Sequence, residues 1–180
     1  MADPDLAAEV HHAGGSYPVV AGWGIIDQLG QRLGDLGIKG PAYIITDENV
    51  MNPYGRSVQR SLQIAGIAAH VFIIPAGESS KSFDLAQHIF HWLVERRAER
   101  GQAIIAVGGG VAGDLAGFVA ATFLRGVPFI QVPTSMAAMV DASIGGKVAV
   151  NLPEAKNMVG AFYQPKGGFA DVKALSTLGK

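Results

Sequence analysis

The residues best suited to chemistry lie in the stretch VDASIGGKVAVNLPEAKNMVG, residues 140–160. Asp141, Lys147, Lys156 and Asn157 stand there among glycines and small apolar residues, in a chain of 180 residues of which only 16% are charged. Removing two ammonium groups from water costs free energy unless anions compensate them. The stretch therefore raises the question of which anions these lysines meet.

A bound anion answers that question in one interpretation. The chain offers Asp141, with Glu78 or Glu154, as carboxylate partners for Lys147 and Lys156, and these are too few to fix every cation. A ligand phosphate or carboxylate would supply the remaining negative charge. In the alternative interpretation both lysines lie on a surface loop and are solvated by water. The residues alone leave both interpretations open.

A glycine-rich turn forms a second candidate site, in AIIAVGGGVAGDLAGF at residues 103–118. Gly108, Gly110 and Gly113 satisfy G-x-G-x-x-G between an expected strand and an expected helix, and Gly109 adds a further open position. Glycines let a phosphate approach the backbone, and the free N–H groups at a helix start attract anions. The motif does not open the domain and lacks an acidic residue about twenty positions later, so it predicts a nucleotide or phosphate site without specifying a dinucleotide. A tight turn that binds no ligand is the alternative.

Further polar residues follow two other expected strands. In PAGESSKS, residues 75–82, Glu78 could accept hydrogen bonds from a ribose or adenine and Lys81 could reach a phosphate. The alternative is a solvated helix cap with an incidental ion pair. Asp47 is similarly either an acceptor for sugar hydroxyls or a turn residue. His88 and His91 share an i, i+3 spacing without a third ligand nearby, so we expect them to face solvent rather than a metal.

Composition excludes several classes of function. A net charge of −1 and a pI near 6.5 give no general attraction to nucleic acid or to anionic membranes. The absence of cysteine excludes disulfides and thiolate metal sites, and it fits a reducing compartment such as the cytoplasm. Residues 103–124 are long enough to span a bilayer, but they contain five glycines and Asp114. We expect a buried strand and a packed helix there, in a protein that does not enter the membrane.

Strands and helices alternate along the chain, which predicts an α/β fold: a doubly wound, mostly parallel sheet flanked by helices, in one Rossmann-like domain over residues 1–180. Strands are expected at residues 16–24, 42–47, 69–77, 103–107, 128–132 and 167–172, and helices at 25–36, 56–66, 82–99, 115–124 and 135–144. In the third of these helices Ser82 is the expected N-cap, and the expected apolar face consists of Ala86, Ile89, Phe90, Leu93 and Val94.

Ligands of such sheets bind at the carboxyl ends of the strands. Asp47 follows one expected strand, Glu78 and Lys81 the next, the glycines a third, and Thr134 with Ser135 a fourth. We therefore expect these four groups to meet at one edge of the sheet.

Taken together, these motifs resemble the 3-dehydroquinate synthase family. The most specific parts of the likeness are GGGVAGDLAGF, RGVPFIQVPT, VDASIGGK and KNMVGAFYQP, between Gly108 and Pro165, and TDENV and GESSK extend it in the same order. In that family the amino-terminal domain binds NAD, a carboxy-terminal helical domain binds a divalent metal such as zinc or cobalt, and the substrate lies between them.

The resemblance implies roles for individual residues. Lys147 and Asn157 would contact substrate, with Asp141 beside them, and Arg125 would reach the substrate phosphate across a dimer interface. The residues implied to hold NAD or its surroundings are Asp47, Glu78, Lys81, Gly109, Gly110, Gly113, Asp114, Thr134, Ser135, Asp141, Lys147, Lys156, Leu175 and Thr177. A homodimer formed through residues 125–132 is also implied.

The implied reaction converts 3-deoxy-arabino-heptulosonate 7-phosphate, a small phosphorylated sugar acid, into 3-dehydroquinate and phosphate, with NAD as a catalyst. Ser135 stands where many members have threonine, and Ala155 where glycine is usual. We expect the metal ligands, a glutamate and two histidines, to lie beyond Lys180, so that this half is inactive alone. A sister cyclase that makes an inosose or a valiolone and a non-catalytic nucleotide-binding module are the alternatives.

Overall fold

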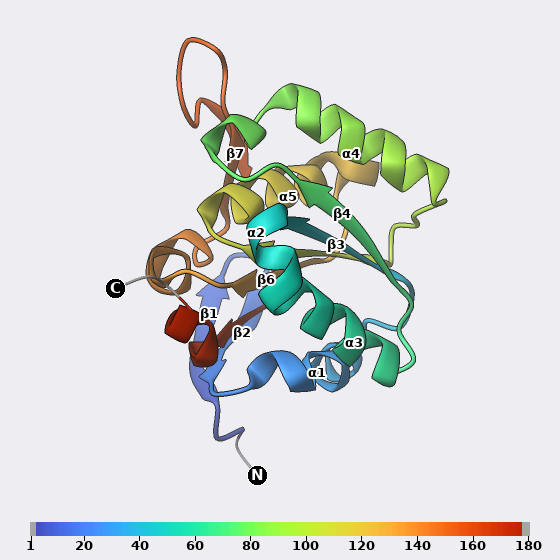
Figure 1. Cartoon of the computed structure of the whole chain (residues 1–180), viewed down its shortest axis with the longest axis vertical. Helices are drawn as coiled ribbons and strands as arrows, with labels where there is room; N and C mark the ends of the chain where they lie inside the picture. Colours follow the sequence, from blue (N-terminus) through green and yellow to red (C-terminus); the bar gives the residue numbers. More distant parts are fainter. Residues whose placement is uncertain (1–2, 178–180) are drawn as a thin grey trace.

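A seven-stranded sheet runs through the middle of the chain (Figure 1). The computed structural model describes residues 3–177. In spatial order the sheet contains β1 (Leu6–His12), β2 (Gly15–Gly22), β9 (Gly167–Asp171), β6 (Phe129–Pro133), β5 (Ala103–Gly108), β3 (Ala42–Asp47) and β4 (Ala69–Ile74). Only β1 is antiparallel to its neighbour, and every other pairing in this sheet is parallel. The predicted mostly parallel sheet is confirmed.

Helices cover both faces of this sheet, as predicted (Figure 1). One layer contains α4 (Phe83–Glu95) and α5 (Gly110–Thr122), and the opposite layer contains α1 (Leu29–Asp35) and α3 (Arg56–Ile64). The short α2 (Glu48–Val50) and a π-helical turn, Met51–Gly55, connect β3 to α3. Because β3 leads into a helix on one face and β5 into a helix on the other, the winding direction of the sheet changes between these two strands.

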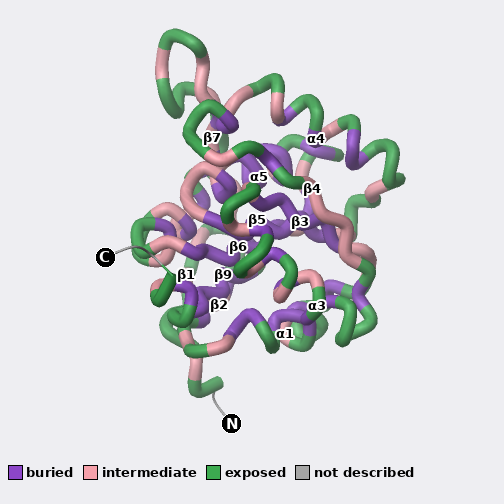
Figure 2. The backbone as a smooth tube through the Cα atoms, in the orientation of Figure 1, coloured by how far each residue is buried: buried purple, intermediate pink, exposed green. Residues whose placement is uncertain are grey.

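Two separate cores result from this layering (Figure 2). Tyr43 and Ile45 of β3 pack with α4 and α5, while Ile44 packs with α1 and α3. All six residues of β5 are buried, which confirms a strand that is apolar on both faces. The run expected to be a strand and a packed helix therefore lies inside the domain, and no helix within residues 3–177 is long and apolar enough to cross a membrane.

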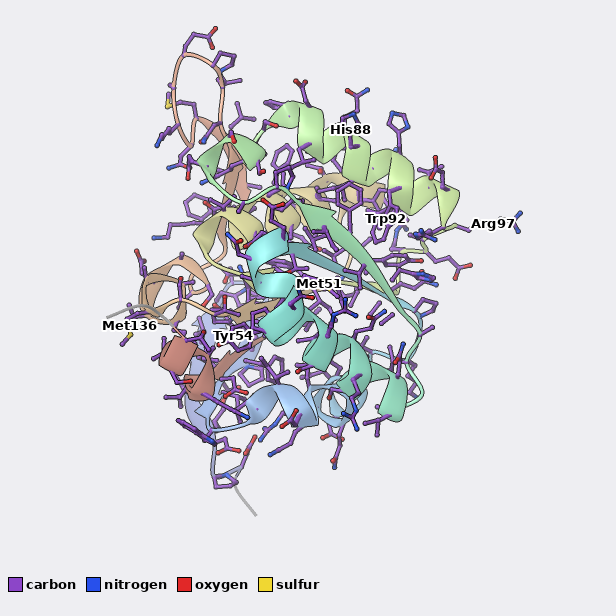
Figure 3. The ribbon with its side chains drawn as sticks, viewed as in Figure 1. Met51, Tyr54, His88, Trp92, Arg97 and Met136 are labelled. Atoms are coloured by element: carbon purple, nitrogen blue, oxygen red, sulfur yellow. The ribbon has the colours of Figure 1, made fainter. Side chains whose placement is uncertain are left out.

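In helix α4 the predicted N-cap residue is confirmed, and the predicted apolar face is wrong at one position. The Ser82 hydroxyl accepts a hydrogen bond from the Leu85 N–H at 3.2 Å. Trp92 points toward the sheet and meets the Tyr43 ring edge-on at 5.6 Å, whereas His88 points outward (Figure 3). Val94 is 65% exposed, so its assignment to the apolar face was wrong. Its neighbour Trp92 takes that place because its large ring fills the space over β4.

Two pieces of regular structure were not predicted. Strand β1 is mostly exposed and rich in alanine, so it has little of the alternating pattern that indicates a strand. The hairpin of β7 (Lys147–Val150) and β8 (Val159–Phe162) lies in a region for which no strand was expected. Helix α5 begins at Gly110 rather than at residue 115, and the helix expected at 135–144 is reduced to a turn with π-helical geometry at Ala138–Ala142.

The contact between α1 and α3 provides a test of the fold with a matched control in the same helix. A Cβ added at Gly30 would lie 2.3 Å from the Ser61 carbonyl oxygen, whereas a Cβ at Gly34 would meet nothing within 4 Å. We expect Gly30→Ala to lower the free energy of unfolding by about 1–3 kcal/mol through overpacking. Gly34→Ala should leave it unchanged or raise it by up to about 1 kcal/mol, because alanine favours the helix. Urea unfolding measures both, and equal effects would contradict this packing.

Candidate functional site

The turn after β5 presents an open helix start at the point where the winding of the sheet changes. Gly109 is the N-cap residue of α5 and has no side chain to occupy the N–H groups of the first turn. A Cβ at Gly109 would lie 3.5 Å from the Ser135 hydroxyl, an ordinary contact, so the position is open rather than crowded. At Gly113, in contrast, a Cβ would come within 3.0 Å of the Gln131 side chain. The last glycine of the motif therefore serves close packing of α5 on β6.

Polar residues from the neighbouring strand ends surround this turn. One Asp47 carboxylate oxygen caps α2 by accepting from the Asn49 and Val50 N–H groups at 2.9 and 3.0 Å. Its other oxygen lies 3.6 Å from the place of a Cβ on Gly108, so it faces the glycine turn. On the other side, the Thr134 N–H donates to the Gly108 carbonyl at 3.0 Å. The predicted meeting of the β3, β5 and β6 ends is confirmed.

The end of β4 joins this edge through a buried lysine. Lys81 lies in the turn before α4, and its side chain is only 5% exposed. Its ammonium group donates hydrogen bonds to the carboxylate of Asp114, on α5, and to the side-chain oxygen of Asn157. Burial raises the pKa of Asp114 above its ordinary value, and the hydrogen bond and charge of Lys81 oppose that rise. The incidental ion pair between Glu78 and Lys81 is not formed, since Glu78 accepts instead from Asn151 at 2.8 Å.

The desolvation argument made from the sequence therefore applied to the wrong lysines. Lys147 is 61% exposed and lies 3.3 Å from Asp141, itself 77% exposed. Lys156 is also exposed. Both lysines face water, as in the alternative interpretation, because the hairpin and its loop project from the domain (Figure 2). Of the carboxylates expected to be available to these lysines, Asp141 pairs with Lys147.

Two hollows border the hairpin. The first, of about 530 Å³, is lined by Asp114, Asp141, Lys147, Asn157 and by apolar residues of the hairpin, Phe162 among them. The second, of about 630 Å³, lies between the Glu78–Lys81 turn and the loop that carries Lys156. Both are of the size typical of small-molecule sites. The exposed Lys147 lines the first hollow together with Asp114, and the exposed Lys156 lines the second together with Lys81.

Two groups of the predicted residues lie apart from this centre. Leu175 and Thr177 belong to the final helical turn, Val172–Thr177, which the Tyr54 hydroxyl holds through hydrogen bonds to the Ala174 carbonyl and to Thr177 (Figure 3). This places them beside the segment that follows Asp47. Arg125 lies beyond the other end of α5, a helix of 13 residues, and so about 20 Å from the glycine turn. Within a single chain Arg125 does not reach the site.

Sequence reasoning missed Asn151 and Tyr54. Asn151 is named by no motif, and its role depends on the unpredicted hairpin, so no local signal pointed to it. Tyr54 lies in a turn far in sequence from Thr177. Among residues 3–177 no three side chains of the His, Asp or Glu type are grouped so that they could hold a metal ion.

Comparison with known proteins agrees with this geometry. The family model described as 3-dehydroquinate synthase N-terminal matches residues 71–180, more than half of the chain. The chain belongs to the 3-dehydroquinate synthase family. The 3-dehydroquinate synthase of Enterococcus faecalis is 47% identical over 163 residues, which cover 91% of this chain and 46% of that relative. The chain thus spans about half the length of the curated relatives it matches.

Solved structures of other cyclases extend the family relationship. A 2-deoxy-scyllo-inosose synthase, in complex with carbaglucose-6-phosphate, NAD⁺ and Co²⁺, matches with a TM-score of 0.88 and 27% identity over 95% of this chain and 47% of that chain. The 2-epi-5-epi-valiolone synthase of Streptomyces hygroscopicus, with NAD⁺ and Zn²⁺ bound, matches with a TM-score of 0.81 and 27% identity over 96% of this chain and 47% of that one. The family resemblance read from the sequence is confirmed.

The ion pair of Lys81 and Asp114 leads to a prediction of how the stability of a variant depends on pH. We expect Lys81→Met to lower the free energy of unfolding by about 3 kcal/mol at neutral pH, because it leaves the half-buried Asp114 carboxylate without its cation. Since the pKa of Asp114 is raised in the folded protein, its charge opposes folding at neutral pH; this cost falls as pH drops below the raised pKa and is gone below the pKa of the unfolded chain. The difference between variant and wild type should therefore shrink in acid.

Urea unfolding at several pH values tests this. Lys156→Met is the matched control, because that lysine is exposed, and it should change the free energy of unfolding by less than about 0.5 kcal/mol. A loss for Lys81→Met that stays constant across the acid range would contradict the assignment to Asp114.

Proposed function

We propose that this chain is the NAD-binding part of a 3-dehydroquinate synthase that converts 3-deoxy-arabino-heptulosonate 7-phosphate into 3-dehydroquinate and phosphate. The observation that carries the proposal is the uncapped start of α5 at the change in sheet winding, with Asp47 facing the Gly108–Gly110 turn. Dinucleotides bind at such a point, with their diphosphate on the helix start. The 47% identity to relatives of that name supports the choice of reaction.

The fit to NAD rests on space and on hydrogen-bonding capacity. The open face at Gly109 would admit a diphosphate, and the free oxygen of Asp47 suits a sugar hydroxyl. We assign the cofactor contacts to the residues that the family resemblance implies: Asp47, Glu78, Lys81, Gly109, Gly110, Gly113, Asp114, Thr134, Ser135, Asp141, Lys147, Lys156, Leu175 and Thr177. When bound, NAD supplies a nicotinamide ring that can accept and return a hydride.

The chain's own groups would bind and orient the substrate. Lys147 and Asn157 line the first hollow, where an ammonium group and an amide can hold the phosphate or carboxylate of a sugar acid. Asp141 keeps Lys147 over that hollow through their ion pair. Asp114 lines the same hollow, and its ion pair with the buried Lys81 leaves the exposed Lys147 as the cation offered to a ligand.

We propose zinc or cobalt for the complete enzyme, as in the cyclase structures that contain these metals. The described residues provide no ligand set for such an ion, so no step of the reaction is assigned to them through a metal.

An intact enzyme offered each substrate would separate this activity from that of an inosose or valiolone synthase. Phosphate release from 3-deoxy-arabino-heptulosonate 7-phosphate is expected.

The net charge of −1 favours small-molecule partners over nucleic acid, and the absence of cysteine suits the cytoplasm.

The cofactor assignment predicts the effect of one methyl group at the open turn. We expect this chain to bind one NAD per molecule, and Gly109→Ala to weaken binding on the order of tenfold, or about 1.4 kcal/mol. The added Cβ meets only an ordinary contact in the fold, so the loss should come from the ligand side. Calorimetric titration measures it. Gly101→Ala, at an open surface position, is the control, and an unchanged affinity in Gly109→Ala would contradict the proposal.

We also propose that the chain forms a homodimer near Arg125. Of the region proposed for that contact, Phe129–Val132 lies in a central strand and is buried, so only the segment around Leu124–Gly126 remains on the surface. Leu124 and Arg125 adopt positive φ angles of 50° and 66°, which costs free energy and is typical of functional segments. The family resemblance implies that Arg125 of each subunit reaches the substrate phosphate of the other across this contact.

Sedimentation over a range of concentrations tests this interface. Leu124→Asp should shift the chain to monomer, because it places a charge in the contact, and aspartate tolerates positive φ better than most residues. Val94→Asp, at another exposed apolar position, should leave the dimer intact. A wild-type chain that stays monomeric at high concentration would overturn the proposal.

A further inference from the structure

Asn151, directly after β7, connects two segments that the proposed function uses. Its backbone N–H donates to the Lys81 carbonyl at 2.8 Å. Its side-chain NH₂ donates to the Glu78 carboxylate at 2.8 Å, and its side-chain oxygen accepts from the Asn157 N–H at 2.9 Å. One residue thus joins the turn after β4 to the loop of the hairpin.

The position of the hairpin loop depends on these contacts. Leu152 and Ala155 close a small turn by two reciprocal backbone hydrogen bonds of 2.9 and 3.3 Å. Asn157 then adopts a positive φ of 58°, which turns its side-chain oxygen to the ammonium group of Lys81. The loop projects from the domain (Figure 1), and Asn151 and Asn157 make its hydrogen bonds to the Glu78–Lys81 turn.

We propose that Asn151 is a positioning residue, which holds Lys156 and Asn157 at a fixed place relative to the Glu78–Lys81 turn. This inference rests on the proposed function, because those two segments are the ones assigned to the cofactor and the substrate. Asn151 lines the second hollow, but its polar atoms are engaged by Glu78 and Asn157 rather than offered to a ligand. Its effect on binding is therefore exerted through the residues that it holds.

The chemistry of the link explains why an amide is needed. Glu78 offers only acceptor oxygens and the Asn157 backbone offers a donor, so the connecting group must donate on one side and accept on the other. An asparagine side chain does both. A carboxylate at position 151 would still accept from Asn157 but would place its negative charge against Glu78.

This polarity permits a double-mutant test in the full chain, with calorimetric NAD titration as the readout. We expect Asn151→Asp to weaken NAD binding about tenfold in the wild-type background, which is within the range of coupling between residues in contact. In the Glu78→Gln background, Asn151→Asp should cause no loss of NAD affinity beyond that of Glu78→Gln alone. The amide introduced at position 78 can then donate to the carboxylate introduced at position 151. A purely structural defect would cost the same in both backgrounds.

The controls make each outcome decisive. Asn52→Asp changes another exposed asparagine, whose side chain accepts from Arg56, and should leave the NAD affinity unchanged. Equal losses from Asn151→Asp in both backgrounds, or no loss in the wild-type background, would overturn the inference.

A second measurement does not depend on cofactor binding. Asn151→Ala removes the acceptor of the Asn157 amide, so hydrogen exchange at that amide should accelerate; Asn151→Ser, too short to reach both partners, serves the same purpose if the alanine variant does not fold. Failure of wild type to bind NAD would contradict the proposed function alone. Unchanged exchange at Asn157 in these variants would contradict the positioning role alone.

Discussion

Lys81 is the point where three parts of the chain meet, and the architecture of the site follows from satisfying its buried charge. A lysine that is 5% exposed requires an anion and hydrogen-bond acceptors nearby. Asp114 of α5 provides the charge, and Asn157 of the hairpin loop provides a further acceptor. The turn after β4, the helix after β5 and the loop after β7 are thereby held together, although 76 residues separate Lys81 from Asn157.

Buried and exposed charges have different roles in this arrangement. Lys81 and Asp114 neutralise each other within the protein, whereas Lys147 and Lys156 remain in water at the rims of the two hollows. An exposed ammonium group can take up a ligand anion without the cost of being buried alone. The glycine turn adds backbone donors at the start of α5, the helix that also carries Asp114. Local positive charge and backbone donors are thus available at this edge of a chain whose net charge is only −1.

Much of the fold was predictable because its signals are local. Runs such as residues 103–107 are apolar on both faces, and Ser82 caps its helix as its type indicates. The convergence of Asp47, the glycines and Thr134 also followed, since parallel strands bring their carboxyl ends to one edge. The interpretation in which Lys147 and Lys156 are removed from water is wrong for the opposite reason. Burial depends on which distant segment covers a residue, and glycine-rich surroundings in the sequence do not supply that information.

The sequence by itself determined the class of fold, the family and the set of residues at the strand ends, because periodicity, turn glycines and motif spacing are properties of short segments. Tertiary structure alone decided which lysine is buried, which acid neutralises it, and that Arg125 stands at the far end of α5. It also decided the role of Asn151, whose three hydrogen bonds reach residues 6 to 73 positions away. These are pairings between distant segments, and only the packed chain brings their atoms within hydrogen-bond distance.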